Sequence, residues 1–557
     1  MPTLKKLLSD LRSTCNQFTE EAHQRKMDLL DRLSELKKFN VNELNFYHDC
    51  LLFLMAYPQN KELYNMAGLE LQRLPAIAAK LSESKNAREQ MAMNGTGIEN
   101  SYIIASFSYD ICRWLIEKYP DNVQYFSCDA DEQTQQSVLK KILPAALTYC
   151  FDKDYKGFAK WKNSFAIGND ATGIKRILDL FSESVNDASV RDELFDSMRF
   201  FIQINVAAPL FSRTTNRTQA NHLFFHKGDL IRKAELIKIL SQPVNQPLQI
   251  SEHEKIHLVD SSKCALMMLL RETDPVTYAQ VNETEWHQLD RGISIALYYM
   301  EPSRRMPLDA YVGYMAYKNG CPIAYGGAWI FMDHARIGVN VFEPYRGGES
   351  AFIFGQILRL YAQRFNLKQF EAEPYQIGHN NVEGIKSGAF WFYYRLGFRP
   401  QQNHLLKIAD EEWNRIISDK NYRSSTVCLK KLALSFMVLK LDSAVSIIEL
   451  NALSVKANEW TSKNLNGNVA SLKSLIEKAA KGIFKNYNIK SLSPLQKEVM
   501  HNILALLLPF VENIKWDKKS TDLLMKAIIE KASGSEFKYL KALNENKALR
   551  QILTSDH

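Results

Sequence analysis

The feature that most limits the fold of this chain is a run of aromatic and β-favouring residues, YVGYMAYKNGCPIAYGGAWIF, at positions 311–331. Asn319 and Gly320 stand in the middle of this run. An Asn-Gly pair between two strand-like segments is the strongest short-range signal for a β-hairpin, because both turn positions need a positive φ. The sequence therefore predicts an antiparallel hairpin near the centre of the chain.

The segments that follow the hairpin alternate between strand and helix patterns. ARIGVNVFEP at 335–344 predicts a third strand, and a glycine-containing turn leads into an amphipathic helix over 349–365. KQFEAEPY at 368–375 predicts another strand, and a helix is expected over 388–395. Together these segments predict a mixed sheet with helices packed against it.

The regions on either side of this sheet have the spacing of helices. In residues 1–245 and 411–557, apolar residues recur every three or four positions with charges between them. Pro243 and Pro247 lie in a polar segment that predicts a linker. We therefore expect an α+β protein with an all-helical N-terminal region, a central sheet domain over 250–408 and an all-helical C-terminal region.

Composition narrows the classes of protein that fit. The 557 residues correspond to about three or four domains. The eight cysteines form no CxxC pair, which argues against a zinc module or a disulfide framework. The N-terminus reaches Asp10 and Arg12 before any long apolar core, and the most apolar stretch, 503–511, is far shorter than the ~20 residues of a spanning helix. We expect a cytoplasmic protein with no membrane span.

The positive charge of the chain is concentrated at its C-terminal end. Residues 411–557 contain 23 Lys and Arg against 15 Asp and Glu, whereas the rest of the chain is neutral. This excess predicts either a solvated, lysine-rich helical surface or a surface for an acidic protein partner. Nucleic acid is a less suitable partner, because no arginine patch is interleaved with aromatic residues.

The turn before the helix at 349–365 has the layout of a phosphate-binding loop. Free backbone N–H groups at a helix start carry partial positive charge, and glycines let an anion approach them closely. The candidate binding residues are Arg346, Gly347, Gly348, Glu349, Ser350 and Ala351.

At these residues the sequence resembles the GCN5-related N-acetyltransferase (GNAT) superfamily, over about residues 250–408. The acyl-CoA loop of that family has Arg or Gln, two residues, Gly, one residue, then Gly or Ala. Arg346 and Ala351 match its ends, and Glu349 occupies its middle Gly position.

A second family motif closes the domain with Ala, a few residues, Tyr, two residues and Leu-Gly-Phe. This chain reads AFWFYYRLGFRP at 389–400. The Asn that usually precedes the Tyr is replaced by Lys386, and Asn380 and Asn381 lie further back. We assign Asn381 to the cofactor-binding set.

The resemblance implies direct transfer of an acyl group from acetyl-CoA, another acyl-CoA or a carrier thioester to an amine acceptor, without a metal. The strands 336–342 and 368–373 would hold the thioester between them. A backbone N–H near Val341 or Phe342 would polarise its carbonyl group. The chemistry also needs an acid for the leaving thiolate and a base for the attacking amine.

The resemblance implies Tyr393 as the acid, and Tyr394 is the neighbouring alternative. Glu343, Glu371 and Glu373 are the candidate bases, and the last two share a strand face because they are two residues apart. Packing roles for the tyrosines and surface roles for the glutamates remain open. A non-catalytic GNAT-like binding or scaffold protein is the alternative function, because Glu349 and Lys386 depart from the motifs.

A competing motif is His253-Glu254-Lys255-Ile256-His257, a literal HExxH sequence. On a helix this spacing places two imidazoles on one face for zinc. The cation at Lys255 and the missing third histidine argue against a zinc protease. The segment KIHLVDS, 255–261, fits better as the first strand of the central sheet.

Overall fold

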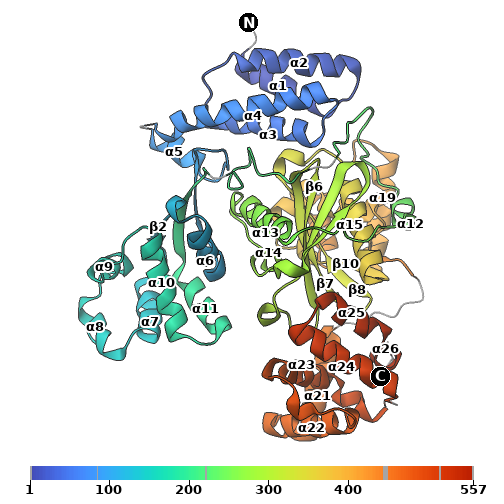
Figure 1. Cartoon of the computed structure of the whole chain (residues 1–557). Helices are drawn as coiled ribbons and strands as arrows, with labels where there is room; N and C mark the ends of the chain where they lie inside the picture. The colour runs from blue at the N-terminus through green and yellow to red at the C-terminus, as the bar shows by residue number, and fades with distance from the viewer. Residues whose placement is uncertain are drawn as a thin grey trace.

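The computed structural model describes residues 3–554 except 85, 208, 220–221, 443–449 and 514–515. An N-terminal helical body lies at the top of Figure 1. Its helices are α1 (Leu4–Cys15), α2 (Glu20–Ser34), α3 (Val41–Ala56), α4 (Lys61–Ser82) and α5 (Ala87–Met93). The Asn40 side chain caps α3 in a capping box with Glu43. α3 is buried on most sides because it packs between its neighbouring helices and the central domain.

The prediction that residues 1–245 are all helical is wrong for one lobe. This lobe contains a three-stranded antiparallel sheet in the order β1-β3-β2. Its elements are β1 (Tyr102–Ser106), α6 (Tyr109–Lys118), β2 (Val123–Cys128), α7 (Glu132–Ile142), α8 (Phe151–Asp154), α9 (Phe158–Ser164), α10 (Ala171–Ser184), α11 (Ala188–Met198) and β3 (Phe200–Asn205). The strands alternate buried and exposed residues over only five or six positions, which is too short to stand out from the helical patterns around them.

A long segment, 207–250, crosses from this lobe to the central domain. Its one described helix is α12 (Leu236–Ser241), which packs against a helix of the central domain. In the predicted linker, the backbone N–H of Val244 donates to the Gln363 side chain, and Leu248 forms a bridge with Trp286. The predicted linker therefore contacts the central domain at two points, Val244 and Leu248.

The central domain is built on a nine-stranded sheet, and the α+β class is confirmed. The helices α13 (Glu252–Met267) and α14 (Asp274–Thr277) come first, followed by β4 (Glu285–Gln288), β5 (Ile293–Tyr298), β6 (Ala310–Lys318), β7 (Cys321–Phe331), β8 (His334–Ile337), β9 (Asn340–Val341) and α15 (Ser350–Phe365). The remaining elements are β10 (Gln369–Ala372), α16 (Pro374–Ile377), α17 (Val382–Ser387), α18 (Ala389–Arg395), β11 (Arg399–Pro400), α19 (Asn403–Ser418), α20 (Thr426–Leu432) and β12 (Met437–Lys440).

The strand order is β11-β12-β10-β8-β7-β6-β5-β4, and β9 pairs with β7. β8 and β10 run parallel, whereas the other neighbouring strands in this order run antiparallel. The predicted hairpin is confirmed: Lys318 pairs with Cys321, and Asn319 and Gly320 both have positive φ. β12 extends the sheet domain beyond 408, within a stretch predicted to be helical.

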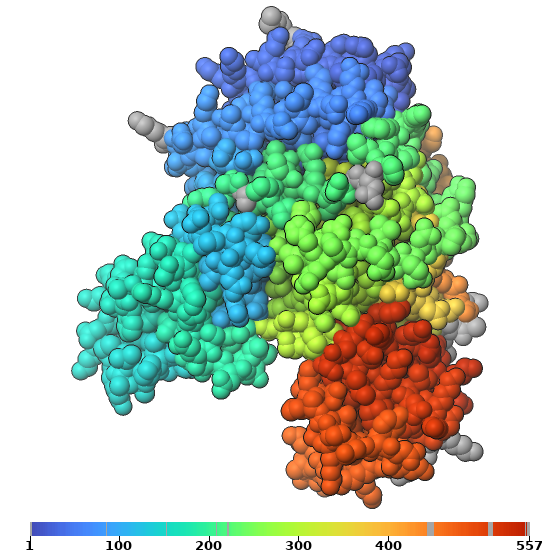
Figure 2. Space-filling model, in the orientation of Figure 1, coloured from blue at the N-terminus to red at the C-terminus, as the bar shows by residue number. Residues whose placement is uncertain are grey.

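The C-terminal region is helical and lies at the bottom of Figure 1. Its helices are α21 (Leu450–Leu465), α22 (Val469–Ile483), α23 (Pro494–Leu507), α24 (Lys518–Ser533), α25 (Glu536–Glu545) and α26 (Lys547–Thr554). Figure 2 shows this region and the three-stranded lobe as two bodies that protrude separately from the central domain. Among the described residues, none of the helices combines the length and the apolar character needed to cross a membrane.

Arg305 fastens the C-terminal region to the central domain. Its guanidinium donates to the carbonyl oxygens of Glu530 and Lys531 at 3.0 and 2.9 Å, and to that of Gly534 at 2.8 Å. These carbonyls belong to the last turn of α24 and to Gly534 just beyond it, where helix carbonyls lack part of their normal helical partners. The buried Lys531 ammonium completes this contact, because it binds the Asp309 carbonyl and the Glu536 carboxylate.

We expect Arg305→Met to loosen α24, because three carbonyl oxygens lose their donor while the side-chain length is kept. The free energy of opening of α24 should fall by about 2–4 kcal/mol. Hydrogen exchange of the α24 amides measures this quantity. Lys526→Met, on the exposed face of the same helix, is the control and should change it little. Equal exchange in the two variants would contradict this role.

Candidate functional site

The central sheet opens between its two parallel strands. β8 pairs with β10 from His334 to Arg336, opposite Gln369 to Glu371. The chain then passes through Gly338 and Val339, and β9 pairs with β7 instead. The pairing between the two predicted thioester-holding strands therefore ends after Arg336 and Glu371. We call the opening beyond these residues the split.

Three side chains converge on the backbone at the split. A Cβ atom at Gly338 would lie 2.7 Å from the Gln376 amide nitrogen, so the close approach of Gln376 needs a glycine. The Tyr314 hydroxyl donates to the Gly338 carbonyl at 2.9 Å. The Tyr393 hydroxyl lies close to the backbone of Val339. Sequence analysis did not single out Gln376 or Tyr314.

The two candidate tyrosines have different surroundings. Tyr393 is buried against Phe354 and Phe398, and its hydroxyl has no hydrogen-bond partner among the described residues. Burial raises its pKa, and the backbone of Val339 offsets this in part. The Tyr394 hydroxyl instead donates to Asp410 in α19, and burial together with this contact raises its pKa to about 12. Of the two hydroxyls, Tyr393 is therefore the one at the split.

The three candidate glutamates lie in different places. Glu371 is buried, and its carboxylate lies 3.1 Å from His334 Nε2. Glu373 follows the end of β10 and pairs with Arg336 at 3.2 Å. Glu343 is exposed in the turn after β9. The structure therefore places Glu371 in β10 and Glu373 just after it, each with its own partner, and leaves Glu343 apart.

Glu371 faces a cavity on one face of the sheet, which we call the sheet-face cavity. Its volume is about 160 Å³, and it is lined in part by Asp309, Trp329, His334, Arg336 and Glu371. These strand residues share a face, because Trp329 pairs with Arg336, which pairs with Glu371. His334 and Arg336 were missed in the sequence, although polar residues two apart at the start of a predicted strand carry the necessary signal.

The N-terminal body covers part of the predicted phosphate loop. The Arg12 guanidinium donates to the backbone oxygens of Pro344 and Arg346. A Cβ atom at Gly348 would lie 2.6 Å from the Tyr57 hydroxyl. Gly347, with a φ of 93°, remains exposed and open. The Gly348 side of the loop is thus filled by the protein itself.

The remaining loop candidates are placed as follows. The exposed Arg346 guanidinium pairs with Glu383 at 2.7 Å. Ser350 and Ala351 are half-buried at the start of α15. Asn381 lies outside the loop, and its side-chain oxygen caps α17 by accepting from the Gly384 N–H at 2.9 Å.

Glu349 points inward rather than toward a ligand at the loop. Its side chain is fully buried, and its carboxylate accepts from Arg291 at 2.6 Å and from the Ile231 N–H at 3.0 Å. The Lys318 ammonium lies 3.2 Å away. Burial acts to raise the pKa of Glu349, but Lys318, the Ile231 N–H and Arg291 outweigh it and lower that pKa. Burial also lowers the pKa of Lys318, to about 8.

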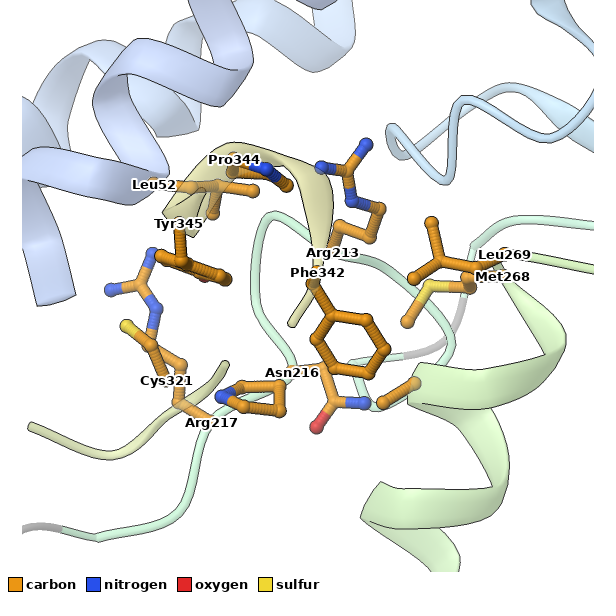
Figure 3. Close-up of a pocket in the computed structure, with 12 residues that line it drawn as sticks. Leu52, Arg213, Asn216, Arg217, Met268, Leu269, Cys321, Phe342, Pro344 and Tyr345 are labelled. Carbon is orange, nitrogen blue, oxygen red and sulfur yellow. The ribbon is translucent and has the colours of Figure 1, made fainter. Parts of the chain in front are cut away.

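The backbone N–H groups expected to polarise a carbonyl lie at the edge of β9. The Phe342 N–H already donates to the Ile323 carbonyl at 2.9 Å, so that part of the prediction is wrong. Val341 pairs with Ala324 of β7. Figure 3 shows the Phe342 and Tyr345 rings lining a small cavity with Arg213 and Arg217. Its volume of about 30 Å³ holds about two water molecules and is too small for a thioester.

The prediction that 255–261 is a strand is also wrong, because the segment lies inside α13. Glu254 closes a capping box with Ser251, whose backbone N–H and hydroxyl both donate to its carboxylate at 2.7 Å. The HExxH pattern therefore coincides with a helix start. In the described part of the chain, no group of three or more His, Cys, Asp or Glu side chains is arranged to hold a metal ion.

We expect Glu349→Gln to lower the free energy of unfolding by about 3–5 kcal/mol, because it leaves the buried Lys318 ammonium without its counter-charge. Adding Lys318→Met should recover part of this loss. Glu343→Gln in the same loop is exposed and serves as the control. Urea titrations measure the three variants, and a loss below about 1 kcal/mol for Glu349→Gln would contradict the assignment.

The Glu349–Lys318 pair also predicts that the free energy of unfolding depends on pH. Because the folded pKa of Glu349 is lowered, its contribution is complete above its unfolded pKa of about 4.3 and is lost as the pH falls through the folded value. The difference in stability between wild type and Glu349→Gln should therefore shrink in acid. A difference that stays constant from pH 7 to pH 3 would show that the pKa of Glu349 is the same in the folded and unfolded chains, and a difference that grows in acid would show a neutral carboxyl group in the folded protein; either result would contradict the assignment.

Comparison of the chain with protein-family models, with curated proteins and with solved structures returns no match. The resemblance described above therefore rests on the two motifs and on the order of the elements. What the resemblance implies about function therefore stays a prediction. The split, the sheet-face cavity and the loop are the parts of the structure that bear on it.

Proposed function

We propose that the protein is a GNAT-like acyltransferase that moves an acyl group, most simply acetyl, from a CoA or carrier thioester to an amine. The observation that carries this proposal is the split between β8 and β10, with the unpartnered Tyr393 hydroxyl beside Val339. An extended thioester arm fits such an opening, because neighbouring backbone can bind its amide groups as a strand would.

Tyr393 would act on the leaving group. The amine nitrogen attacks the thioester carbonyl, the new C–N bond forms, the C–S bond breaks to release a thiolate, and the surplus proton on the new amide nitrogen passes to water. Burial keeps the Tyr393 hydroxyl protonated, because it raises the pKa above the ordinary value of about 10. An ordinary thiol has a pKa of about 8.5, so the hydroxyl stabilises the thiolate by a hydrogen bond rather than by complete proton transfer.

Glu371 and His334 would accept a proton from the acceptor amine. An ammonium group must lose a proton before it attacks, and the Glu371–His334 pair can accept it. The sheet-face cavity offers an ammonium group the carboxylates of Asp309 and Glu371 and the ring of Trp329, and Arg336, which pairs with Asp309 at 3.7 Å, offsets part of that negative charge. Glu371 is also the last residue of β10 that pairs with β8, so the cavity adjoins the split.

The loop would make a smaller contribution than the family motif implies. Arg346 and Gly347 are exposed and Ser350 and Ala351 are half-buried, whereas Tyr57 fills the Gly348 side. We propose that the donor's phosphates contact Arg346 and Gly347 only. Restoring the family glycine by Glu349→Gly would not improve binding, because that change would remove the counter-charge of Lys318.

A non-catalytic scaffold is the second candidate function. It is favoured by the buried Glu349 carboxylate and by Tyr57, which together occupy the part of the loop where a pyrophosphate would bind in the family motif. A scaffold would use the same fold without turning over a thioester. The two tyrosines of α18 provide a matched test of these functions.

We expect Tyr393→Phe to lower kcat for acyl transfer by about 10- to 100-fold, because it removes one hydrogen bond to the thiolate. Tyr394→Phe, which loses only the bond to Asp410, should stay within about threefold of wild type. Release of free CoA from acetyl-CoA, with a panel of amine acceptors, measures turnover. A wild-type chain that binds acetyl-CoA but never releases CoA would support the scaffold, and equal effects of the two variants would remove Tyr393 from the mechanism.

We also propose that the protein works in the cytoplasm and that an acidic carrier protein docks on its basic C-terminal region. The eight cysteines are all free, which suits a reducing compartment. Lys473, Lys478 and Lys481 are exposed on α22. A carrier delivering a thioester would be steered by such a surface.

Reversing the charge of these three lysines to Glu should weaken binding of an acyl carrier protein and flatten its salt dependence. The matched control reverses Lys5, Lys37 and Lys38, which are exposed on the N-terminal body. Binding is measured by calorimetry at low and moderate salt. Equal binding by both triple variants would contradict the docking surface. Full-length chains are needed, because β12 makes residues after 411 part of the sheet.

A further inference from the structure

A large cavity lies away from the split, between the N-terminal body and the crossing segment. Its volume is about 570 Å³, within the range of small-molecule sites. It is lined by the α1–α2 turn at Phe18, by His23 of α2, by Gln59 and Asn60 of the α3–α4 turn, and by the segment that begins at His226. We call it the histidine groove.

The protonation of His226 follows from its neighbours. Its Nδ1 atom lies 3.2 Å from the Arg291 guanidinium, which can only donate, so Nδ1 is the acceptor. The ring hydrogen therefore resides on Nε2, which is buried without a partner among the described residues. Burial, with the nearby Lys318, lowers the pKa of His226 to about 3, so the ring is neutral at physiological pH. Its backbone N–H is held by the Pro58 carbonyl at 2.8 Å.

His23 has the complementary arrangement. Its Nε2 atom lies 3.2 Å from the Asn60 side-chain nitrogen, and the Asn60 oxygen is fixed because it accepts the Leu63 N–H at 2.9 Å. The amide nitrogen must therefore donate to Nε2, which places the hydrogen of His23 on Nδ1. Nδ1 is also buried without a partner among the described residues. Both histidines line the groove, and each has a buried ring N–H that no described residue accepts.

The charges around the groove favour a negative ligand. Lys26, Arg291 and Lys318 lie near His226 and all act to lower its pKa, whereas Glu349 alone among the charges acts to raise it. Lys26 is fully buried, with its ammonium 4.7 Å from the centre of the Phe18 ring. The exposed rim opposes these buried cations, because it carries three carboxylates, Glu20, Glu62 and Asp229, against one cation, Lys227, but solvent screens the rim charges.

We propose that the histidine groove binds the oxyanion of a small molecule, a carboxylate or phosphate group, through the Nε2–H of His226 and the Nδ1–H of His23. Unpartnered buried donors are costly, and an oxyanion would supply acceptors for both of them. The site is independent of the proposed acyl transfer. It also adjoins the Glu349 network, because Arg291 contacts both His226 and Glu349.

The experiment titrates inorganic phosphate and, separately, acetate into the full-length protein at constant ionic strength. Calorimetry measures affinity, and ¹⁵N-histidine NMR follows the two ring hydrogens. We expect saturable binding of at least one of the two anions, with shifts at His226 Nε2–H and His23 Nδ1–H. The anion that binds more tightly identifies the preferred group.

His226→Phe keeps an aromatic ring but removes the donor, and it should weaken binding about tenfold. His226→Gln restores a donor and should recover part of the loss. Lys238→Gln removes an exposed cation on α12 as the control and should bind like wild type. If His226→Phe does not fold, the wild-type NMR shifts decide the question. Absence of saturable binding by both anions, or binding without shifts at either histidine, would overturn the proposal.

Discussion

The buried carboxylate of Glu349 is the contact on which the arrangement of the central domain depends. A charged group taken out of water is tolerated only when opposite charges and hydrogen bonds surround it. Glu349 meets this condition through residues from separate parts of the chain: Ile231 of the crossing segment, Arg291 before β5 and Lys318 at the hairpin. The backbone N–H of Glu349 also approaches Tyr57 of the N-terminal body. The contacts of this one residue thus hold the start of α15 against the central sheet and against the N-terminal body.

This network also limits which residues are available to the proposed acyl-transfer site. Tyr57 fills the inner side of the predicted phosphate loop, and the Glu349 carboxylate points into the protein, away from any ligand at the surface. The split between β8 and β10 lies apart from the network and keeps an unpartnered hydroxyl at Tyr393. The case for acyl transfer therefore rests on the split and on the sheet-face cavity, and only to a small degree on the loop.

The elements that could be predicted from the sequence were those with strong local signals. The Asn319-Gly320 hairpin and the long helix α15 follow from turn chemistry and from helical spacing. The short strand β3 was hidden because its alternation covers only six residues after a helix. The strand expected at 255–261 is instead part of α13, because the capping box at Ser251 starts a helix there.

The contacts of the candidate site are harder to predict because they join distant positions. Glu349 meets Ile231 118 residues away in the sequence, and Tyr57 lies 292 residues from it. No local pattern indicates that a carboxylate in a glycine position will be buried. Likewise, the His334–Glu371 pair forms only because two parallel strands lie side by side.

The most direct test of the central claim is a crystal structure of the protein with a non-reactive thioether analogue of acetyl-CoA. The account predicts that the pantetheine arm lies between β8–β9 and β10, that Gln376 moves away from Gly338, and that the sulfur lies within hydrogen-bond distance of the Tyr393 hydroxyl. An analogue that binds elsewhere, leaving the split closed and Tyr393 unpartnered, would contradict it.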